Sequence, residues 1–310
     1  MCLLFGKNKR IPDCDYEILF MPNLLISYKT KILVKNGQFL CLLLFAPFLI
    51  SNNCYAEEQN THYKLGIFPH LSESHIEKAY TAIAKDLSEH TSKRIKFDVD
   101  DNFENFSSNL EQGKYDIVLV QPFDYVNIVK KLAYHPLASQ KKALRAIIVV
   151  RKHSPLRTLN NLLGRDLYLP PRSTAISYLT KHHLTNAKFD LEKDINITHE
   201  STHISCLLKV IIRIADACAT APEAVELFEE KLPVKFRVLN QTNPIPHVLF
   251  AAHPRVTSED RAALKKQMVS WENSVSGQEL LKESRMRGLR IIDDQQYDVV
   301  RRIKQEVERY

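Results

Sequence analysis

The chain has 310 residues, of which 45% are hydrophobic, 25% charged and 9% aromatic, with 7 glycines and 14 prolines. This composition is typical of a folded protein and excludes intrinsically disordered, collagen-like and low-complexity chains. The formal net charge of +7 falls to about +4 outside residues 1–56, and the basic residues are scattered, so the charge does not indicate nucleic-acid binding.

Residues 1–56 have the three parts of a secretory signal peptide. A basic stretch from Lys29 to Lys35 precedes the apolar run Phe39–Ile50, and a polar segment ends at Ala56. The apolar run is shorter than the roughly 20 residues that cross a bilayer, which argues against a membrane anchor. We therefore predict export with cleavage after Ala56. Residues 1–20 lie far upstream of the apolar run, so translation begins either at Met1 or at Met21.

Strand-like and helix-like segments alternate along the rest of the chain, which predicts an α/β fold. A capping-box pair, Ser276 and Glu279, is expected to open the last helix. In chain order the other expected elements are strand 63–68, helix 73–90, strand 95–99, helix 103–112, strand 115–120, strand 143–151, strand 166–169, helix 173–184, strand 194–198, helix 201–212, strand 215–220, helix 222–230, strand 236–240, strand 248–252 and helix 258–271.

The order of these elements suggests two α/β lobes. We expect residues 57–148 and 246–310 to form lobe I and residues 149–245 to form lobe II, so that the chain crosses twice between them. Strand ends and helix N-termini then converge on the cleft between the lobes, where ligands commonly bind.

Two cysteines, Cys206 and Cys218, remain after removal of the predicted signal peptide. Cys206 falls near the start of an expected helix, and Cys218 near the end of the strand that follows. Export to an oxidising compartment allows one disulfide between them, and two buried free thiols are the alternative.

Several segments follow one another in a specific order, namely Asp116–Tyr125, Pro136–Ala138, Ile147–Pro155, Leu159–Gly164, Ser173-Thr174, His199-Glu200, and Ala215-Asp216 followed by Glu223. In this order they resemble the phosphate-, phosphite- and phosphonate-binding periplasmic proteins of ABC transporters, which have the type 2 periplasmic binding fold. The resemblance covers nearly all of residues 60–310. It implies two lobes that close by a hinge over a small phosphorus oxyanion, with no chemical reaction and no cofactor.

The resemblance also implies the partners and the location of the chain. It is expected in the periplasm, where its closed form would be presented to the permease of an ABC transporter in the inner membrane. The alternative is a ligand-sensing input protein for a membrane sensor kinase. Proteins of this fold commonly act as monomers, and no nucleic-acid partner is expected.

Ser173 and Thr174 are the candidate anion ligands in lobe II. They open a helix, so their hydroxyls and the free N–H groups of its first turn would face an oxyanion at the positive end of the helix dipole. Ordinary N-capping is the alternative role for both residues. The resembled family has a third hydroxyl and a glycine next, and this chain has Ala175 and Ile176.

Four further residues are expected in the cleft because of the resemblance. Pro122 ends the strand 115–120, and His199 matches a histidine that donates to phosphonate oxygens. Glu223 matches a glutamate that pairs with the amino group of the ligand, although a capping box with Thr220 also explains it. His247 stands where binders of an ammonium group carry aspartate, and Val120 where they carry tyrosine. A smaller oxyanion, or one with a different substituent, therefore fits better than an ammonium-bearing ligand.

A competing motif lies in the same region. His199-Glu200-Ser201-Thr202-His203 reads H-E-x-x-H, the pattern of zinc hydrolases in which both histidines bind zinc and the glutamate is the general base. That chemistry requires the motif to lie within one helix, whereas residues 194–198 read as a strand leading into it. We expect no metal site and no enzyme activity.

Overall fold

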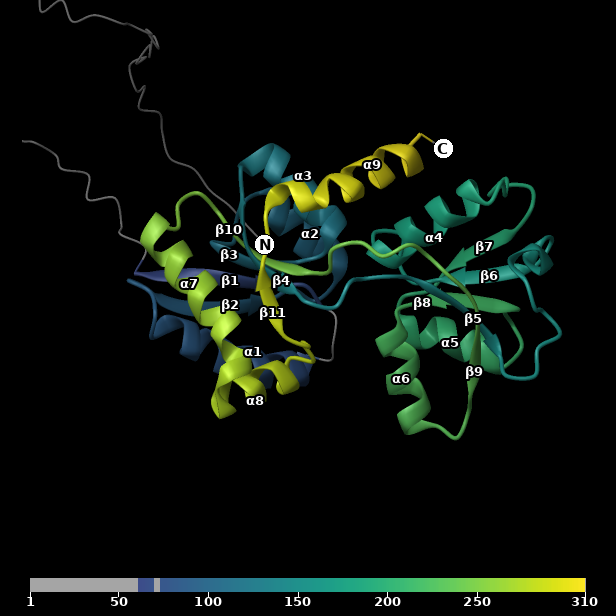
Figure 1. Ribbon diagram of the computed structural model, residues 1–310, viewed down its shortest axis with the longest axis horizontal. Helices are drawn as coiled ribbons and strands as arrows, with labels where there is room; N and C mark the ends of the chain where they lie inside the picture. The colour runs from purple at the N-terminus through teal and green to yellow at the C-terminus, as the bar shows by residue number, and fades with distance from the viewer. Residues whose placement is uncertain (1–60, 70–72, 310) are drawn as a thin grey trace, which may run out of the picture. The chain divides into compact units, whose positions relative to one another are not determined.

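The computed structural model describes residues 61–69 and 73–309, so the predicted signal peptide and its cleavage site lie outside the described residues. Within these ranges the chain is a mixed α/β structure built around two β-sheets (Figure 1). We call the sheet that contains β1, with the helices that cover it, the first lobe, and the other sheet with its helices the second lobe.

The described strands of the first lobe form one sheet in the order β11-β4-β10-β3-β1-β2. β1 pairs in parallel with β2 and β3, whereas β10 runs antiparallel between β3 and β4. β10 and β11 come from the C-terminal part of the chain, so the chain leaves this lobe and later returns to it. The strands are β1 (His62–Ile67), β2 (Arg94–Val99), β3 (Ile117–Val120), β4 (His135–Gln140), β10 (Leu249–Ala252) and β11 (Leu289–Ile291).

The described strands of the second lobe form a sheet in the order β7-β6-β8-β5-β9. β6 pairs in parallel with β7 and β8, and β5 runs antiparallel between β8 and β9. This sheet is built from one continuous stretch of the chain. Its strands are β5 (Ile147–Arg151), β6 (Asp166–Leu169), β7 (Asn196–His199), β8 (Ala217–Thr220) and β9 (Phe236–Gln241).

The helices cover the sheets and begin at side-chain caps or at proline. Helices α2, α4, α5, α7 and α8 have an N-cap side chain that accepts from a backbone N–H, and α3 and α6 begin with proline. The helices are α1 (Glu73–Ser88), α2 (Phe103–Glu111), α3 (Pro122–Leu132), α4 (Ala175–Asn186), α5 (His203–Ile211), α6 (Pro222–Lys231), α7 (Ser258–Ser270), α8 (Val275–Glu283) and α9 (Asp298–Val307), with short 3-10 turns at Leu159–Leu162, Trp271–Asn273 and Asp294–Tyr297.

Different helices cover the two faces of the second sheet (Figure 1). Successive side chains of a strand point to opposite faces. In β5, Ile148 packs in a buried cluster with Leu184 of α4, whereas its neighbour Val149 packs in a cluster with Leu207 of α5 and Phe228 of α6. A side chain of this sheet therefore faces either α4 or the pair α5 and α6, and successive residues of a strand face opposite sides.

Two chain segments, residues 141–146 and 242–248, connect the lobes side by side. The backbone N–H groups of Leu144 and Ile245 each donate to the other residue's carbonyl, over 2.9 and 2.8 Å. The N–H of Ala146 also donates to the Thr242 hydroxyl over 3.0 Å. These bonds tie the two connections into a single antiparallel link between the lobes.

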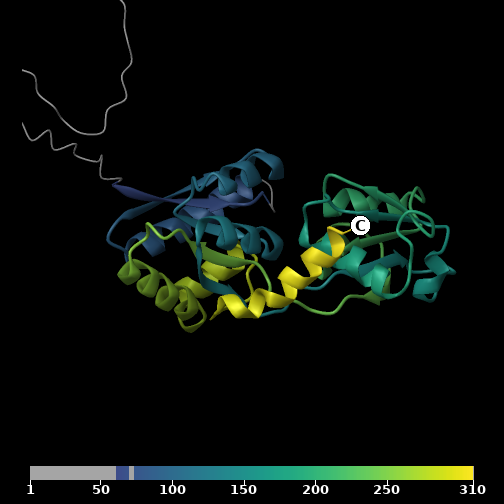
Figure 2. The same ribbon diagram turned by 90° about the horizontal axis from the view of Figure 1, so that it is seen from above.

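Helix α9 extends from the first lobe to the second. It packs against α3 and α4, and Figures 1 and 2 both show it running from the first sheet toward α4. His182 of α4 and Glu306 of α9 lie 2.9 Å apart. The C-terminal helix thus adds a second connection between the lobes beside the paired chain segments.

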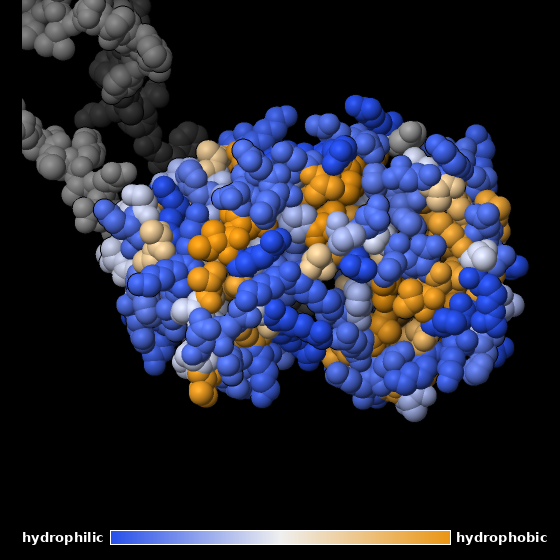
Figure 3. All heavy atoms as spheres, in the orientation of Figure 1, coloured by the Kyte–Doolittle hydropathy of each residue, from blue (hydrophilic) through white to orange (hydrophobic). Residues whose placement is uncertain are grey.

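On the face shown in Figure 3, hydrophilic side chains dominate and hydrophobic ones gather in separate patches. Among the described residues, no helix has the length and apolar character needed to cross a membrane.

Of the two states left open for the cysteines, the structure has the disulfide. Cys206 and Cys218 are bonded, with their Cα atoms 5.8 Å apart, and the bond ties α5 to the adjacent strand β8. Both residues are fully buried within the cluster beneath α5 and α6. The alternative of two free thiols is therefore wrong.

Most of the predicted elements are present between residues 62 and 271. Four elements of the structure were not predicted: α3 and β4 within this range, and β11 and α9 beyond it. The expected strand 143–151 begins only at Ile147, because residues 143–146 belong to the connection between the lobes. The capping box at Ser276 and Glu279 is also wrong. α8 begins two residues earlier, and Ser274 is its N-cap, accepting from the N–H of Gly277 over 3.0 Å.

Candidate functional site

The N-terminus of α4 lies where the second lobe meets the first. Thr174 is its N-cap: the hydroxyl accepts from the N–H of Ser177 over 3.4 Å and donates to the carbonyl of Pro171 over 2.8 Å. Thr174 is only 3% exposed, whereas Ser173 is exposed. Thr174 caps the N–H of Ser177 and Gln121 accepts from the N–H of Ala175. The groups left to meet an anion are therefore the Ser173 side chain and, in the first turn of α4, the N–H of Ile176.

A side chain of the first lobe reaches this N-terminus. The Gln121 Oε1 accepts from the backbone N–H of Ala175, the first residue of α4, over 3.1 Å. Gln121 is the N-cap residue of α3, and the predicted site residue Pro122 is the buried first residue of that helix. Pro122 has no polar group to offer a ligand beyond its carbonyl, and its fixed φ favours the start of α3. The polar group at this strand end is therefore the Gln121 amide.

A second set of polar side chains surrounds the N-terminus of α6. The Glu223 carboxylate, in the first turn of α6, accepts from the Lys142 Nζ over 2.7 Å. Burial raises the pKa of Glu223, but the hydrogen bond from Lys142, a backbone hydrogen bond and the charge of Lys142 together outweigh it, so the pKa lies below its ordinary value. Ala221 is the N-cap of α6 and makes no side-chain cap, so Glu223 and Thr220 do not form the capping box considered above.

Two histidines lie near Glu223. The Nδ1 of His203, the first residue of α5, shares a 2.8 Å hydrogen bond with the buried Thr220 hydroxyl. His247 lies on the connection between the lobes, and its Nδ1 accepts from the N–H of Val248 over 2.8 Å. Burial lowers the pKa of each histidine to about 4, against an opposing effect of Glu223. Both rings are therefore uncharged at neutral pH, and each retains Nε2 for a further hydrogen bond.

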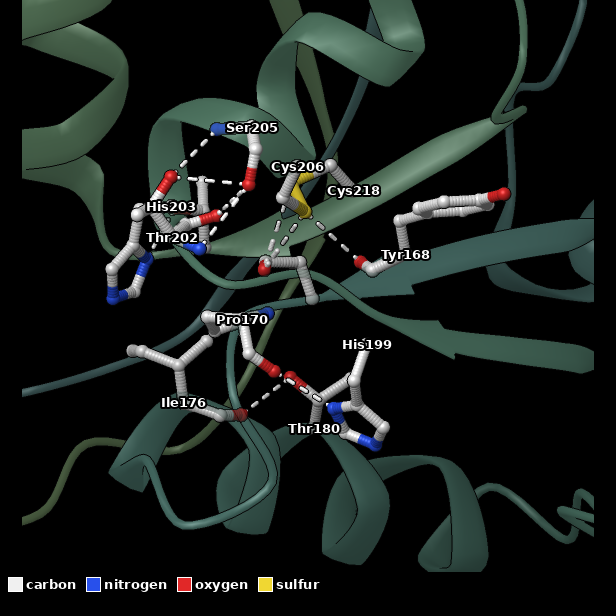
Figure 4. Close-up of a disulfide and its surroundings, with 12 residues drawn as sticks. Tyr168, Pro170, Ile176, Thr180, His199, Thr202, His203, Ser205, Cys206 and Cys218 are labelled. Atoms are coloured by element: carbon white, nitrogen blue, oxygen red, sulfur yellow. Dashed lines mark hydrogen bonds between the residues drawn. A yellow bond between two sulfur atoms is a disulfide. The ribbon is translucent and has the colours of Figure 1, made fainter. Parts of the chain in front are cut away.

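His199 lies apart from this group. It ends β7 on the face of the sheet that α4 covers, because it shares its side of the strand with Ile197, which packs in the cluster of that face. The His199 Nδ1 is 2.7 Å from the Pro170 carbonyl oxygen, and its Nε2 is buried without a partner. Burial lowers the pKa of His199 despite that backbone hydrogen bond. The rings of His199 and His203 lie on either side of Pro170 (Figure 4).

The H-E-x-x-H motif does not have the conformation of a zinc-hydrolase site. His199 belongs to β7 and His203 to α5, so the two rings do not share one face of a helix. They also have different hydrogen-bond partners, Pro170 and Thr220. In the part of the chain that the structure describes, no three His, Cys, Asp or Glu side chains are arranged to hold a metal ion.

The structure thus brings five of the six predicted residues to the junction of the lobes, namely Pro122, Ser173, Thr174, Glu223 and His247. It adds Gln121 and Lys142, for which no motif gave a signal. His203 was considered only as a zinc ligand. The capping pair Thr202 and Ser205 starts α5 at His203. It is the sequence signal that would have placed His203 on a helix and His199 on the preceding strand.

Comparison with known proteins places these features in context. Residues 65–297 match the protein family described as ABC transporter, phosphonate, periplasmic substrate-binding protein. No curated protein sequence matches the chain.

Several solved structures share the fold. A binding protein component of an ABC phosphonate transporter from Pseudomonas aeruginosa has a TM-score of 0.68 at 16% identity, over 80% of this chain and 87% of that one. PhnD1 from Prochlorococcus marinus in complex with methylphosphonate has a TM-score of 0.70 at 14% identity, over 81% and 99%. XAC2383 from Xanthomonas citri, bound to a chloride ion, has a TM-score of 0.63 at 16% identity, over 80% and 98%. At such identities these likenesses show the fold alone, and they confirm the two-lobed architecture.

Proposed function

Because this chain belongs to the family of periplasmic substrate-binding proteins of phosphonate ABC transporters, we propose that it captures a small phosphorus oxyanion that carries no ammonium group. Methylphosphonate, phosphite and phosphate are the candidates. The complex of PhnD1 with methylphosphonate, a protein of the same fold, supports this ligand class.

The observation that carries the choice of ligand is the ion pair between Lys142 and Glu223. A carboxylate that binds the ammonium group of a ligand must be available to it. Here the chain's own ammonium group already lies 2.7 Å from the Glu223 carboxylate. His247, which is neutral at neutral pH, adds no negative charge beside this carboxylate. A ligand with its own ammonium group would have to displace Lys142, and an oxyanion without one would not.

The oxyanion would bind at the N-terminus of α4, between the lobes. The Ser173 hydroxyl and the N–H of Ile176 in the first turn of α4 come from the second lobe, whereas Gln121 comes from the first. A ligand that contacts both lobes favours the closed arrangement, because only there do both sets of donors reach it. The paired segments at Leu144 and Ile245 provide the hinge. The closed form would then be presented to the permease.

Isothermal titration calorimetry with methylphosphonate, phosphite, phosphate, 2-aminoethylphosphonate and sulfate tests this proposal. We expect one of the first three to bind at least about tenfold more tightly than 2-aminoethylphosphonate, a difference of about 1.4 kcal/mol. At 100 times its Kd that ligand should also raise the free energy of unfolding by about 2.7 kcal/mol.

A matched pair of lysine variants isolates the role of the ion pair. Lys142→Ala frees Glu223 and should raise the affinity for 2-aminoethylphosphonate relative to methylphosphonate. Lys141→Ala, which removes a neighbouring lysine paired with Glu272, should leave the ratio unchanged. Tightest binding of 2-aminoethylphosphonate by the unaltered protein would contradict the proposed ligand class, and no binding of any phosphorus oxyanion would contradict the function.

A further inference from the structure

Gln121 is a buried polar side chain that touches both lobes. It follows β3 in the first lobe, and its Oε1 accepts from the N–H of Ala175 in the second. It is only 7% exposed. A long polar side chain is seldom buried to this degree unless its hydrogen-bonding groups are satisfied.

The other end of the same amide is not satisfied. The Gln121 Nε2 is buried and has no hydrogen-bond partner. A flip of the side-chain amide would not satisfy the donor. It would place the NH2 group opposite the N–H of Ala175, so that two donors would face each other. The orientation is therefore determined by α4, and a buried donor is left over beside the N-terminus of that helix.

A buried donor without a partner is unfavourable, and such a group in a folded protein calls for an explanation. Both polar atoms of the Gln121 amide lie in one plane on the same carbon, so Nε2 is next to the first turn of α4, where the proposed oxyanion binds. A phosphorus oxyanion at this position would offer the acceptor that Nε2 lacks.

We propose that Gln121 is a ligand-binding residue of the first lobe: its Nε2 donates to an oxygen of the bound oxyanion while its Oε1 holds the N–H of Ala175. This inference rests on the proposed function and deepens it. One side chain then contacts the ligand and joins the lobes, so that closure and recognition depend on the same amide.

The substitution Gln121→Glu separates these two roles. A glutamate of the same length still accepts from the N–H of Ala175, but it replaces the donor with a carboxylate oxygen that repels an anion. At pH 8 we expect affinity for methylphosphonate or phosphite, whichever the unaltered protein binds, to fall by about 100-fold or more. Gln121→Met, which removes the donor without adding charge, should lower it by about tenfold.

The control is Gln296→Glu, the same change of charge at an exposed position, which should leave the affinity within about twofold. The loss caused by Gln121→Glu should also shrink as the pH falls and the new carboxyl group becomes protonated. Circular dichroism and a thermal melt establish that each variant is folded.

A direct measurement on the unaltered protein does not depend on any variant. The side-chain NH2 resonances of Gln121 in a 15N-correlated NMR spectrum should shift on addition of the same anion, as expected when a donor gains an acceptor. Unshifted resonances, or equal affinities of the unaltered protein and folded Gln121→Glu, would overturn the role of Gln121 while leaving the proposed function intact. If no phosphorus oxyanion binds the unaltered protein, both are overturned.

Discussion

The imidazole of His203 lies between a buried hydroxyl and a carboxylate, and this environment determines its charge. Burial lowers the pKa of His203 to about 4, so the free protein holds the ring neutral at pH 7. An anion that approaches Nε2 favours the protonated ring and raises this pKa. The complex then binds more protons than the free protein, so anion affinity increases as the pH falls toward about 4.

We predict that His203→Asn removes this pH dependence. Between pH 7 and pH 5 the affinity of the unaltered protein for methylphosphonate or phosphite should rise more steeply than that of the variant, whose neutral amide takes up no proton. Calorimetry at several pH values measures, for each protein, the slope of the logarithm of affinity against pH. Protonation of the ligand itself contributes equally to both slopes, so it cancels in their difference. At pH 5 the variant should bind about tenfold more weakly.

His199→Asn is the matched control, since it changes the other histidine of the same motif. The His199 Nδ1 is held by a hydrogen bond with the Pro170 carbonyl on the face of the sheet that α4 covers. If the pH dependence comes from His203, this variant keeps the slope of the unaltered protein. Equal slopes in the unaltered protein and His203→Asn, with a reduced slope in His199→Asn, would assign the pH dependence to His199 instead.

The two histidines also show what can be predicted from a sequence at the scale of single residues. They lie four positions apart in one motif, and their chemistry is identical. What separates them is the alternation of β7 and the point at which α5 begins, and both depend on an element boundary. Gln121 could not be predicted at all, because its partner Ala175 lies in the other lobe.

At the scale of elements, the prediction succeeded where the hydrophobic period was regular, as in α1, whose apolar residues of the repeat are buried. It failed at α3 because Gln121-Pro122 was interpreted as the end of a strand, although proline is equally suited to the first turn of a helix. β4 was missed because Pro136 breaks its pattern, yet this strand pairs with β10 and β11. Such pairings are properties of the folded sheet and leave little trace in a local sequence.

The disulfide between α5 and β8 allows a prediction at this scale. The loop that it closes spans 12 residues, so the loss of chain entropy in the unfolded state should stabilise the fold by about 3 kcal/mol. We expect the double variant Cys206→Ala, Cys218→Ala to lose about this much free energy of unfolding in urea titrations. Anion affinity should change by less than about twofold, because the cap at Thr202 and Ser205 still holds the start of α5.

Reduction provides the control for this prediction. A reducing agent should lower the unfolding free energy of the unaltered protein by a similar amount and leave the double variant unaffected. A variant as stable as the unaltered protein would show that the disulfide does not stabilise the second lobe.

At the scale of the whole described structure, closure depends on contacts that lie on different sides of the lobe junction. The paired connections at Leu144 and Ile245 are the proposed hinge. Beside the candidate anion site, Phe123 of α3 stacks on Tyr178 of α4, with ring centroids 4.4 Å apart and planes inclined by 11°. Lys304 of α9 lies over the Tyr178 ring at 5.6 Å from its centroid. The Tyr178 ring therefore has partners on two elements of the first lobe.

We predict that Tyr178→Ala shifts the ligand-free protein toward an open arrangement of the lobes. Removing the ring eliminates the stacking on Phe123, worth about 0.5–1.5 kcal/mol beyond the burial of its area, and the contact with Lys304. Small-angle X-ray scattering should show a larger radius of gyration without ligand, which saturating methylphosphonate or phosphite returns toward that of the unaltered protein. The apparent Kd should rise in proportion to the lost fraction of the closed form, by about tenfold.

Tyr168→Ala is the matched control, because Tyr168 packs within the second lobe against the cluster beneath α5 and α6. It removes the same side chain without touching the stack on Phe123, so the radius of gyration and its response to ligand should be those of the unaltered protein. If Tyr178→Ala also leaves both unchanged, the α3–α4 stack does not govern closure. The link formed by Gln121 and the ligand would then have to hold the lobes together, and Gln121→Met should show the larger radius instead.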